Sequence, residues 1–439
     1  MQVEKNLILE KEDKSFLRKK WEEILKKIIL NKVPSIYKLN QEVVFLNNEE
    51  ELKNFFSEKN IDIIKKTKII VITIPLNNFT NLISFLDKID KLLDDETRII
   101  INYFSISWNF IFKIFSFFKL IKSFKGSLFF SKKTFNIFLN CTNFEISHKL
   151  NDVSLPLNVP IISKFLLILV NLFPFLSIFS FANIFYLRKK VRSEKTKKLM
   201  SLIIPCRNEE NGIVEIIEEA KKYILFPYQI VFVNDLSDDK TLNNMNLVKS
   251  RNPEINIKII NANGEGKSRA VDKGVVNSDG YFCAILDADL TVRMKDVNLF
   301  YSAISIGNGD LINGSRLIYK LNKNSMRLLN FFGNKFFSII ISYITSSKVT
   351  DTLCGTKCFR KSDWDVFEAF RTENKLDDIW GDFNLIFASS FYGYKLIDLP
   401  IRYYERVSGE TKMKKRFYYF LSMFKLCIIA FSRFKLSLK

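Results

Sequence analysis

Histidine is nearly missing from this sequence, which contains His148 and no other among its 439 residues. A single histidine excludes serine-histidine-aspartate triads and zinc sites built on several imidazoles. Chemistry in this chain must therefore rest on carboxylates, lysine, arginine and hydroxyls. For the same reason, a bound metal is expected to be a hard cation, Mg²⁺ or Mn²⁺.

Cysteine and glycine are also sparse. The six cysteines are scattered, and Cys354 and Cys358 lack the spacing and the second ligand pair of a zinc ribbon. We therefore expect a reducing compartment and no disulfide framework. Residues 1–62 contain no glycine at all, so a backbone that must approach a cofactor closely is not expected there. The first residues show no apolar run behind a basic start, so a signal peptide is not expected.

Positive charge is abundant but unevenly placed. The formal net charge is +20, and most of it is interpreted as a solvated surface. Residues 411–439 differ, because they hold eight Lys or Arg and no Asp or Glu, interleaved with aromatic residues. This pattern predicts a segment that lies on an anionic membrane surface. No nucleic-acid recognition signature is present, so nucleic acid is not an expected partner.

The first part of the chain alternates between strand and helix patterns. With an apolar hairpin-like ending near 182–188, the order resembles the second half of a class I S-adenosylmethionine methyltransferase. Because the glycine-rich first half of that family is missing, the resemblance implies a truncated remnant that does not bind the cofactor. The expected elements are an amphipathic helix over 13–31, strands over 68–75, 98–102 and 144–148, and helices over 77–93, 108–118 and 132–140.

An uncharged run over 165–187 is long enough to span a membrane. Pro174 and two asparagines inside it favour a buried or interfacial element instead. The basic segment 188–198 then predicts a linker. The predicted division is a truncated methyltransferase-like domain over 1–187, the linker 188–198, a main domain over 199–412 and a basic amphipathic tail over 413–439.

In the main domain, short apolar strands alternate with helical patterns and end in polar residues, which predicts βαβ units and a parallel sheet. The ligand site of such a sheet lies beyond the carboxyl ends of its strands, so the polar clusters are expected to form one site. A helix over 325–345 is expected to face the core on one side and a membrane on the other. The other expected elements are strands over 201–205, 229–233, 257–260, 281–286, 310–314 and 395–404, helices over 212–223, 240–250, 267–276 and 295–306, a loop over 349–360, and a helix that begins at Asp378.

Five motifs in this domain occur in a characteristic order and spacing. They resemble the family 2 glycosyltransferases of GT-A fold, and in particular the branch of dolichol- and polyprenyl-phosphate sugar synthases. The resemblance covers about residues 200–438. It implies an α/β fold class, in which a GT-A nucleotide-diphospho-sugar transferase domain follows a smaller α/β domain and precedes a C-terminal amphipathic membrane-surface helix. The motifs are Pro205-Cys-Arg-Asn208-Glu209, Asn234-Asp235, Gly266-Lys267, Asp287-Ala-Asp289 and Arg406-Val-Ser-Gly409-Glu-Thr-Lys412.

The resemblance implies that the acidic motif binds a metal and the donor. Asp287 and Asp289 would hold Mg²⁺ or Mn²⁺ against the diphosphate of the donor, and Asp287 would also face ribose. Asp235 would accept a hydrogen bond from the base. The family's usual pair of Asp is here Asn234-Asp235, which leaves the choice between uracil and guanine open.

The resemblance also assigns the loop after the first strand to the nucleoside, through Pro205, Asn208 and Glu209. A helix cap is the alternative for Asn208 and Glu209. Lys267 and Arg269 open a helix after a glycine, so their charges and the amide dipoles both favour phosphate binding. The glycine spacing there does not match a Walker loop.

The acceptor side of the site is implied by four residues. Asp382 stands where relatives carry an acid near the acceptor, and it would deprotonate an acceptor hydroxyl. A phosphate acceptor would not need that base, and a helix N-cap is the alternative role. Arg402, Arg406 and Lys412 look like the basic end of the family pattern that clamps phosphate, with surface solvation as the alternative.

We therefore expect an inverting, metal-dependent glycosyltransferase of the hexosyltransferase type that uses a nucleoside-diphosphate sugar. It is expected to work peripherally on the cytoplasmic side of a membrane, with a polyprenyl phosphate as acceptor. A hydroxyl of a lipid-linked glycan is the alternative acceptor. Methyl transfer by the first domain is disfavoured by the missing glycines, and an inactive membrane scaffold is disfavoured by the intact acidic pair.

Overall fold

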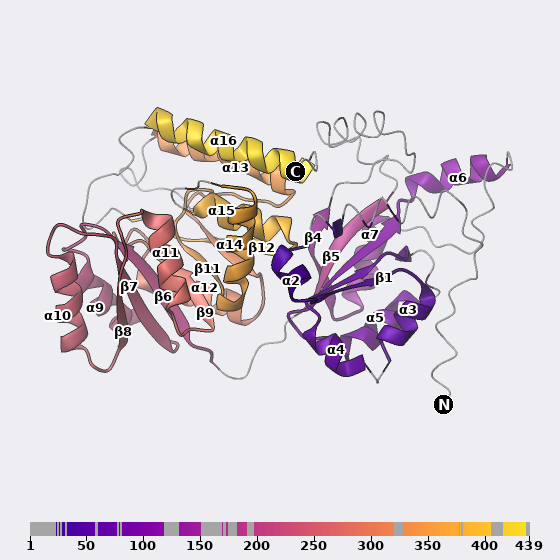
Figure 1. The fold of residues 1–439 in the computed structure, drawn as a ribbon. Coiled ribbons are helices and arrows are strands. Elements are labelled where there is room, and N and C mark those ends of the chain that lie inside the picture. Colours follow the sequence, from indigo (N-terminus) through magenta and orange to yellow (C-terminus); the bar gives the residue numbers. More distant parts are fainter. Residues whose placement is uncertain are drawn as a thin grey trace. The chain divides into compact units, whose positions relative to one another are not determined.

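The structure is a computed structural model of the chain. The chain separates into two compact units, residues 1–190 with 431–439 and residues 191–430 (Figure 1). The predicted segments 13–31 and 165–187 lie mostly outside the described residues. The structure describes residues 23, 26, 29–30, 33–57, 60–76, 79, 81–117, 131–150, 169, 173, 182–190, 197–319, 328–376, 378, 381–404 and 416–435.

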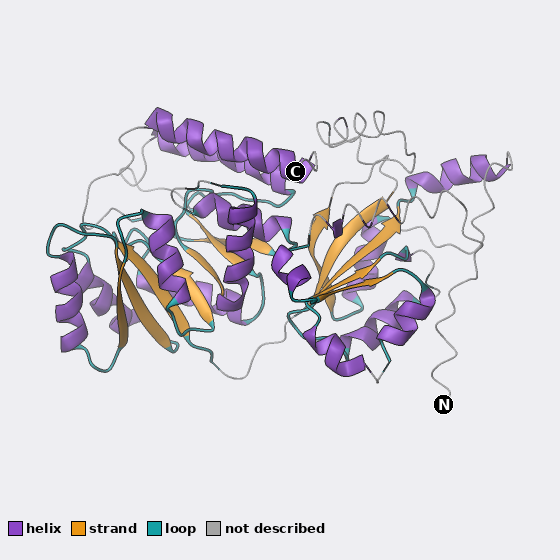
Figure 2. Cartoon of the chain, viewed as in Figure 1, coloured by secondary structure: helices purple, strands orange, loops and turns teal. Residues whose placement is uncertain are grey.

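The first unit is built on a five-stranded sheet of order β1-β2-β3-β5-β4. Figure 2 shows the strands in orange and the helices in purple. The first three strands are parallel, and β5 runs antiparallel to both of its neighbours. The strands are β1 (Val43–Leu46), β2 (Ile69–Ile72), β3 (Arg98–Phe104), β4 (Phe144–Leu150) and β5 (Ala182–Lys189). The described helices are α2 (Ser35–Leu39), α3 (Glu49–Phe55), α4 (Ile61–Lys66), α5 (Leu82–Asp90), α6 (Ser107–Phe117) and α7 (Lys132–Asn140).

The central strands of this sheet are buried on both faces, which explains why their sequences are apolar runs. Ile70 and Ile72 of β2 belong to one hydrophobic cluster, and Ile69 and Val71 belong to the cluster of the opposite face. Parallel strands that are buried on both faces have nearly continuous hydrophobic sequences. The sequence does not predict β1 and α2–α4, because elements of four to seven residues contain too few periods of a pattern.

The second unit has a seven-stranded mixed sheet of order β12-β10-β11-β9-β6-β7-β8. Its strands β6 to β9 are parallel, in agreement with the predicted βαβ units. The strands are β6 (Met200–Cys206), β7 (Tyr228–Asn234), β8 (Asn256–Asn261), β9 (Phe282–Ile285), β10 (Leu311–Ser315), β11 (Lys357–Arg360) and β12 (Leu396–Pro400). The described helices are α9 (Ile213–Tyr223), α10 (Thr241–Arg251), α11 (Lys267–Val276), α12 (Met294–Ser305), α13 (Leu328–Thr345), α14 (Trp364–Glu373), α15 (Asp382–Phe391) and α16 (Arg416–Lys435), whose residues from 431 onward are grouped with the first unit.

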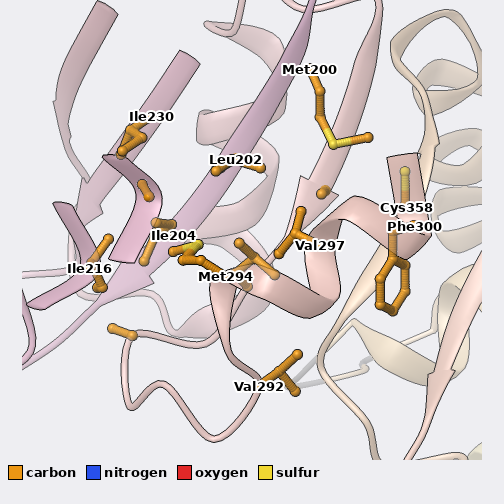
Figure 3. Packing of buried hydrophobic residues seen from close by; sticks show 14 of the residues in the cluster. Met200, Leu202, Ile204, Ile216, Ile230, Val292, Met294, Val297, Phe300 and Cys358 are labelled. Atoms are coloured by element: carbon orange, nitrogen blue, oxygen red, sulfur yellow. The ribbon is translucent and has the colours of Figure 1, made fainter. Parts of the chain in front are cut away.

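Alternate residues of β6 serve the two faces of this sheet. Leu202 and Ile204 pack into a cluster with Ile216 of α9 and Met294 of α12 (Figure 3). Ile203 of β6 points to the other face of the sheet. A Cβ added to Gly274 of α11 would lie 2.5 Å from Cγ2 of Ile203. The glycine therefore lets α11 lie close to the sheet, which brings the start of this helix to the strand ends.

One strand of this sheet falls in a segment that the sequence predicts to be a loop. β11 lies between β9 and β10 and is antiparallel to both. The prediction of a loop over 349–360 is wrong for these four residues, because β11 begins with Lys357 and ends with Arg360, which hide its strand character. Both charges are buried in ion pairs, with Asp382 at 3.1 Å and Asp310 at 3.2 Å.

The helices α13 and α16 lie side by side and expose apolar side chains. The rings of Phe336 and Phe420 stack with centroids 5.8 Å apart. α13 buries Phe337 and Ile341, so the expectation that one of its faces packs on the core is confirmed. Among the described residues, 417–435 is the one helix long and apolar enough to cross a membrane by length and composition. The exposed apolar residues of the pair are Leu329, Phe332, Phe336, Ile339, Phe417, Tyr418, Phe420, Leu421, Phe424 and Ile428.

Candidate active site

The loops that follow β6 and β7 are tied to each other. Asn208 has a positive φ of 57°, and its backbone N–H donates to Oγ of Ser237 at 3.1 Å. In return, the N–H of Asp238 donates to Oδ1 of Asn208 at 2.9 Å. The helix-cap alternative for Asn208 and Glu209 is wrong, because α9 has its N-cap at Gly212. These two residues instead shape the loop at the carboxyl end of β6, where Pro205 is the penultimate residue of the strand.

Asp235 directly follows β7 and is almost fully buried. Its Oδ2 accepts a hydrogen bond from the N–H of Gly266 at 3.1 Å, whereas its Oδ1 is buried without a hydrogen-bond donor among the described residues. Gly266 has a φ of 95°, a conformation that residues with a side chain rarely adopt. A buried acceptor without a donor is costly, so this oxygen is suited to a donor group on a ligand.

The acidic motif follows β9 and meets the start of α11. Oδ1 of Asp287 lies 2.6 Å from Nζ of Lys267. Oδ1 of Asp289 accepts hydrogen bonds from both the N–H and the hydroxyl of Thr291, at 3.2 and 2.9 Å. The structure thus brings the predicted metal motif and the predicted phosphate motif into direct contact.

The electrostatic environment of Lys267 is strongly acidic. Burial alone would lower the pKa of Lys267, but the carboxylates of Asp287, Asp382 and Asp289 raise it above its ordinary value. Lys267 is therefore charged at neutral pH and balances several acids at once. Arg269, in contrast, is exposed, and its charge acts on Glu368 of α14.

Gly355 is a site residue that the sequence analysis missed. A Cβ added there would lie 2.5 Å from Oδ2 of Asp287 and 2.5 Å from Nζ of Lys267. The backbone at this position therefore lies close to the ion pair, and a side chain here would have to displace the ends of the Asp287 and Lys267 side chains. The neighbouring Cys354 is buried, which raises the pKa of its thiol to about 11 and keeps it protonated at neutral pH.

Asp382 is the first residue of α15 and pairs with a buried lysine. Nζ of Lys357 lies 3.1 Å from Oδ1 of Asp382 and also donates to the carbonyl oxygen of Cys354 at 2.5 Å. The N-cap alternative is wrong for Asp382, because Gly381 holds the N-cap position. The predicted helix start at Asp378 is also too early, although Oδ2 of Asp378 accepts from the N–H of Asn384 at 2.8 Å.

A buried ion pair supports the loop that carries Gly355. Asp351 is fully buried, and its two oxygens accept from Nε and Nη2 of Arg316 at 2.7 and 2.9 Å. Nδ2 of Asn334 in α13 donates to the same carboxylate at 2.6 Å, and so does the N–H of Leu353 at 3.1 Å. Burial would raise the pKa of Asp351, but the Arg316 guanidinium and these hydrogen bonds hold it below its ordinary value.

Of the three basic residues predicted near the acceptor, the structure describes Arg402. Arg402 is exposed, and its guanidinium lies over the ring of Tyr319 at 5.9 Å from the centroid. Arg406 and Lys412 lie outside the described residues. The backbone just before them is anchored to the site, because the N–H of Tyr404 donates to the carbonyl oxygen of Thr291 at 3.0 Å.

Sequence comparison assigns this part of the chain to a class of enzymes. Residues 201–367 match the model of glycosyl transferase family 2. The second unit therefore carries a family 2 glycosyltransferase domain, as its motifs predict. The match begins at residue 201, so the methyltransferase resemblance of the first unit stays a prediction.

Within that class, the similar proteins include several dolichyl-phosphate glycosyltransferases. A dolichyl-phosphate beta-glucosyltransferase of Dictyostelium discoideum is 28% identical over 181 residues, which are 37% of this chain and 54% of that protein. A dolichyl-phosphate hexose transferase of Haloferax volcanii is 25% identical over 225 residues, 50% of this chain and 89% of the relative. For several other relatives, the chain spans about half of their length.

Among solved structures, the mannosyltransferase PcManGT of Pyrobaculum calidifontis is similar to this chain. That structure is a complex with GDP-Man and Mn²⁺. It is 15% identical, covers 54% of this chain and 66% of its own, and has a TM-score of 0.39.

Proposed function

We propose that the protein transfers a sugar from a nucleoside-diphosphate sugar to a polyprenyl phosphate at a membrane surface, with inversion at the anomeric carbon. The observation that carries the proposal is the contact between Lys267 and Asp287 at the strand ends of a family 2 domain. This cluster unites a cation for phosphate with carboxylates for metal or ribose.

The donor would be held from its base to its diphosphate by the loops after β6, β7 and β9. The buried Oδ1 of Asp235 would accept an N–H of the base, a group that uracil and guanine both offer. Lys267 and the N-terminal amides of α11 would bind the phosphates, because charge and helix dipole both favour an anion there.

A divalent cation fits this arrangement when the donor supplies part of its coordination. The described residues contain no group of three or more His, Cys, Asp or Glu side chains that could hold a metal ion. Mg²⁺ is, however, commonly held by one or two carboxylates together with substrate phosphates. Asp287 and Asp289 would hold the cation, and it would stabilise negative charge on the departing nucleoside diphosphate.

In the transfer, an acceptor oxygen attacks the anomeric carbon from the side opposite the diphosphate. The new carbon–oxygen bond forms as the bond to the diphosphate breaks, so the configuration inverts. A phosphate oxygen is already ionised, whereas a hydroxyl must lose its proton to a base, for which Asp382 is the candidate.

The exposed apolar faces of α13 and α16 support attachment to a membrane. α16 has no acidic residue and carries Arg416, Lys425, Arg433 and Lys435, of which Lys435 is buried. An apolar face combined with basic residues favours an anionic bilayer surface. We propose a peripheral position on the cytoplasmic side, where nucleotide sugars and polyprenyl phosphates meet.

The test is to incubate the full chain with a panel of UDP- and GDP-sugars and vesicles that contain a polyprenyl phosphate. Formation of a lipid-linked sugar and release of nucleoside diphosphate are expected for one donor. If no donor is consumed, the protein is an inactive scaffold. If donor is consumed only when a lipid-linked glycan is supplied, the acceptor is a hydroxyl.

Asp382 distinguishes the two acceptors independently. With a hydroxyl acceptor, Asp382→Asn should lower the rate by roughly 10² to 10⁴. With a phosphate acceptor it should cost much less, whereas Arg406→Ala should weaken acceptor binding through lost charge-assisted hydrogen bonds. A nearly inactive Asp382→Asn variant beside an Arg406→Ala variant with full acceptor affinity would refute the phosphate acceptor.

A further inference from the structure

We infer that Lys267 is a built-in cation that competes with the divalent metal for Asp287, so that metal binds well only together with the donor diphosphate. The inference rests on the proposed function, because the metal and the donor belong to it. It concerns the order in which the site is filled.

The geometry of the ion pair is the first argument. Nζ of Lys267 lies 2.6 Å from Oδ1 of Asp287. A divalent cation bound to Asp287 would lie at about 2.0–2.2 Å from a carboxylate oxygen, close to this ammonium. Two positive charges so close repel each other, so the ammonium in this position weakens metal binding, and its movement away from Asp287 relieves the repulsion.

The surroundings of the pair limit where a metal can enter. The backbone at Gly355 closes one side, since a Cβ there would lie 2.5 Å from both Nζ of Lys267 and Oδ2 of Asp287. Asp289 is held in place by Thr291, whose hydroxyl and N–H donate to Oδ1. Lys267 is the movable component, because its charge sits at the end of a flexible four-carbon stem.

Charge balance decides when Lys267 leaves. Lys357 pairs with Asp382, and Lys267 is in contact with Asp287. Without nucleotide, a metal would have to bind beside the ammonium or displace it from its contact with Asp287, and either change is costly in a partly buried site. A donor diphosphate removes that cost by offering phosphate oxygens to Lys267. Metal and nucleotide must then strengthen each other's binding by the same factor.

The experiment measures Mn²⁺ binding to the full chain by the electron paramagnetic resonance signal of free Mn²⁺, with and without UDP or GDP. Without nucleotide, Lys267→Met is expected to bind Mn²⁺ about tenfold more tightly than the wild type, a factor typical of coupled sites. The matched control is Lys273→Met, which removes the same charge from the same helix six residues further on. Its Mn²⁺ affinity should equal that of the wild type.

With nucleotide, the wild-type affinity for Mn²⁺ should rise more than that of Lys267→Met. Lys267→Arg keeps the charge and should behave like the wild type in the nucleotide-free titration. Equal nucleotide-free affinities in the wild type and Lys267→Met would overturn the inference. Failure of both nucleotides to bind would instead refute the proposed donor, while the nucleotide-free titration would still decide whether Lys267 competes for the site.

Discussion

The two units build sheets of the same kind but place different side chains at the carboxyl ends of their parallel strands. In the first unit these are uncharged: Thr73 follows β2, and Asn102 of β3 donates to the carbonyl oxygens of Ile72 and Thr73 at 3.1 and 3.0 Å. In the second unit the same edge carries Asp235 and the pair of Lys267 with Asp287.

A buried acceptor without a described partner occurs at both edges, namely Oδ1 of Asn102 and Oδ1 of Asp235. Such an oxygen therefore does not identify a site by itself. The second edge differs through its opposite charges in contact and through glycines that admit them. Gly126 is the only glycine before residue 212, and thirteen of the fourteen lie from there onward.

The largest effect is expected from removing the buried charge that supports the second site. Asp351→Asn leaves Arg316 buried beside a neutral partner and should lower the free energy of unfolding of the second unit by roughly 3–5 kcal/mol. Urea unfolding measures this change, with the exposed Asp62→Asn of the first unit as control. An unchanged unfolding midpoint would show that the pair does not hold the loop of Gly355.

The same pair predicts a dependence on pH. Because the fold lowers the pKa of Asp351, its stabilisation is complete above the unfolded value of about 3.9. It is lost as the pH falls through the lower folded value. The stability difference between the wild type and Asp351→Asn should therefore shrink below about pH 4.

The acidic pair of the second edge should matter for transfer and little for folding. Asp289→Ala removes a proposed metal ligand worth ~3 kcal/mol, so the rate of sugar transfer should fall roughly a hundredfold. Circular dichroism should show the fold unchanged, because the residue lies in a loop after β9. A variant that is equally active with saturating Mn²⁺ and without it would contradict the metal assignment.

Membrane attachment is expected to depend on the second unit and not on the first. Replacing the exposed Phe417 and Leu421 of α16 by Ser should weaken vesicle binding by about 2 kcal/mol, because less apolar surface is removed from water. The matched control is Phe110→Ser on α6 of the first unit, which is also exposed. Flotation with anionic vesicles measures binding. A loss of vesicle binding in Phe110→Ser alone would show that the first unit carries the attachment.

The smallest effect on transfer is expected at the uncharged edge. Asn102→Leu removes two hydrogen bonds and should cost about 1–3 kcal/mol of stability in the first unit. Sugar transfer should stay within the error of the wild type when assayed well below the unfolding temperature. A loss of transfer at full stability would show that the first unit takes part in the reaction.

Much of the second unit follows from its sequence, because its parallel strands are apolar runs and each ends in polar residues. The helices α9 to α12 lie within about one residue of their predicted bounds, since the helical period marks them and a glycine caps the start of α9 and of α11. The position of the Arg402 guanidinium over Tyr319 is not predicted by order along the chain, and its role as a phosphate clamp stays a prediction.

By itself, the sequence determined the α/β class, the family of the second unit, and the gathering of Asp235, Lys267 and Asp287, because parallel strands end at one edge. Only the tertiary structure decided that β11 runs through the predicted loop. Its charged ends are neutralised by Asp310 and Asp382, which lie 50 and 25 residues away. Ion pairs between such distant residues leave no periodic pattern in a sequence, and neither does the close approach of Gly355 to Lys267 and Asp287.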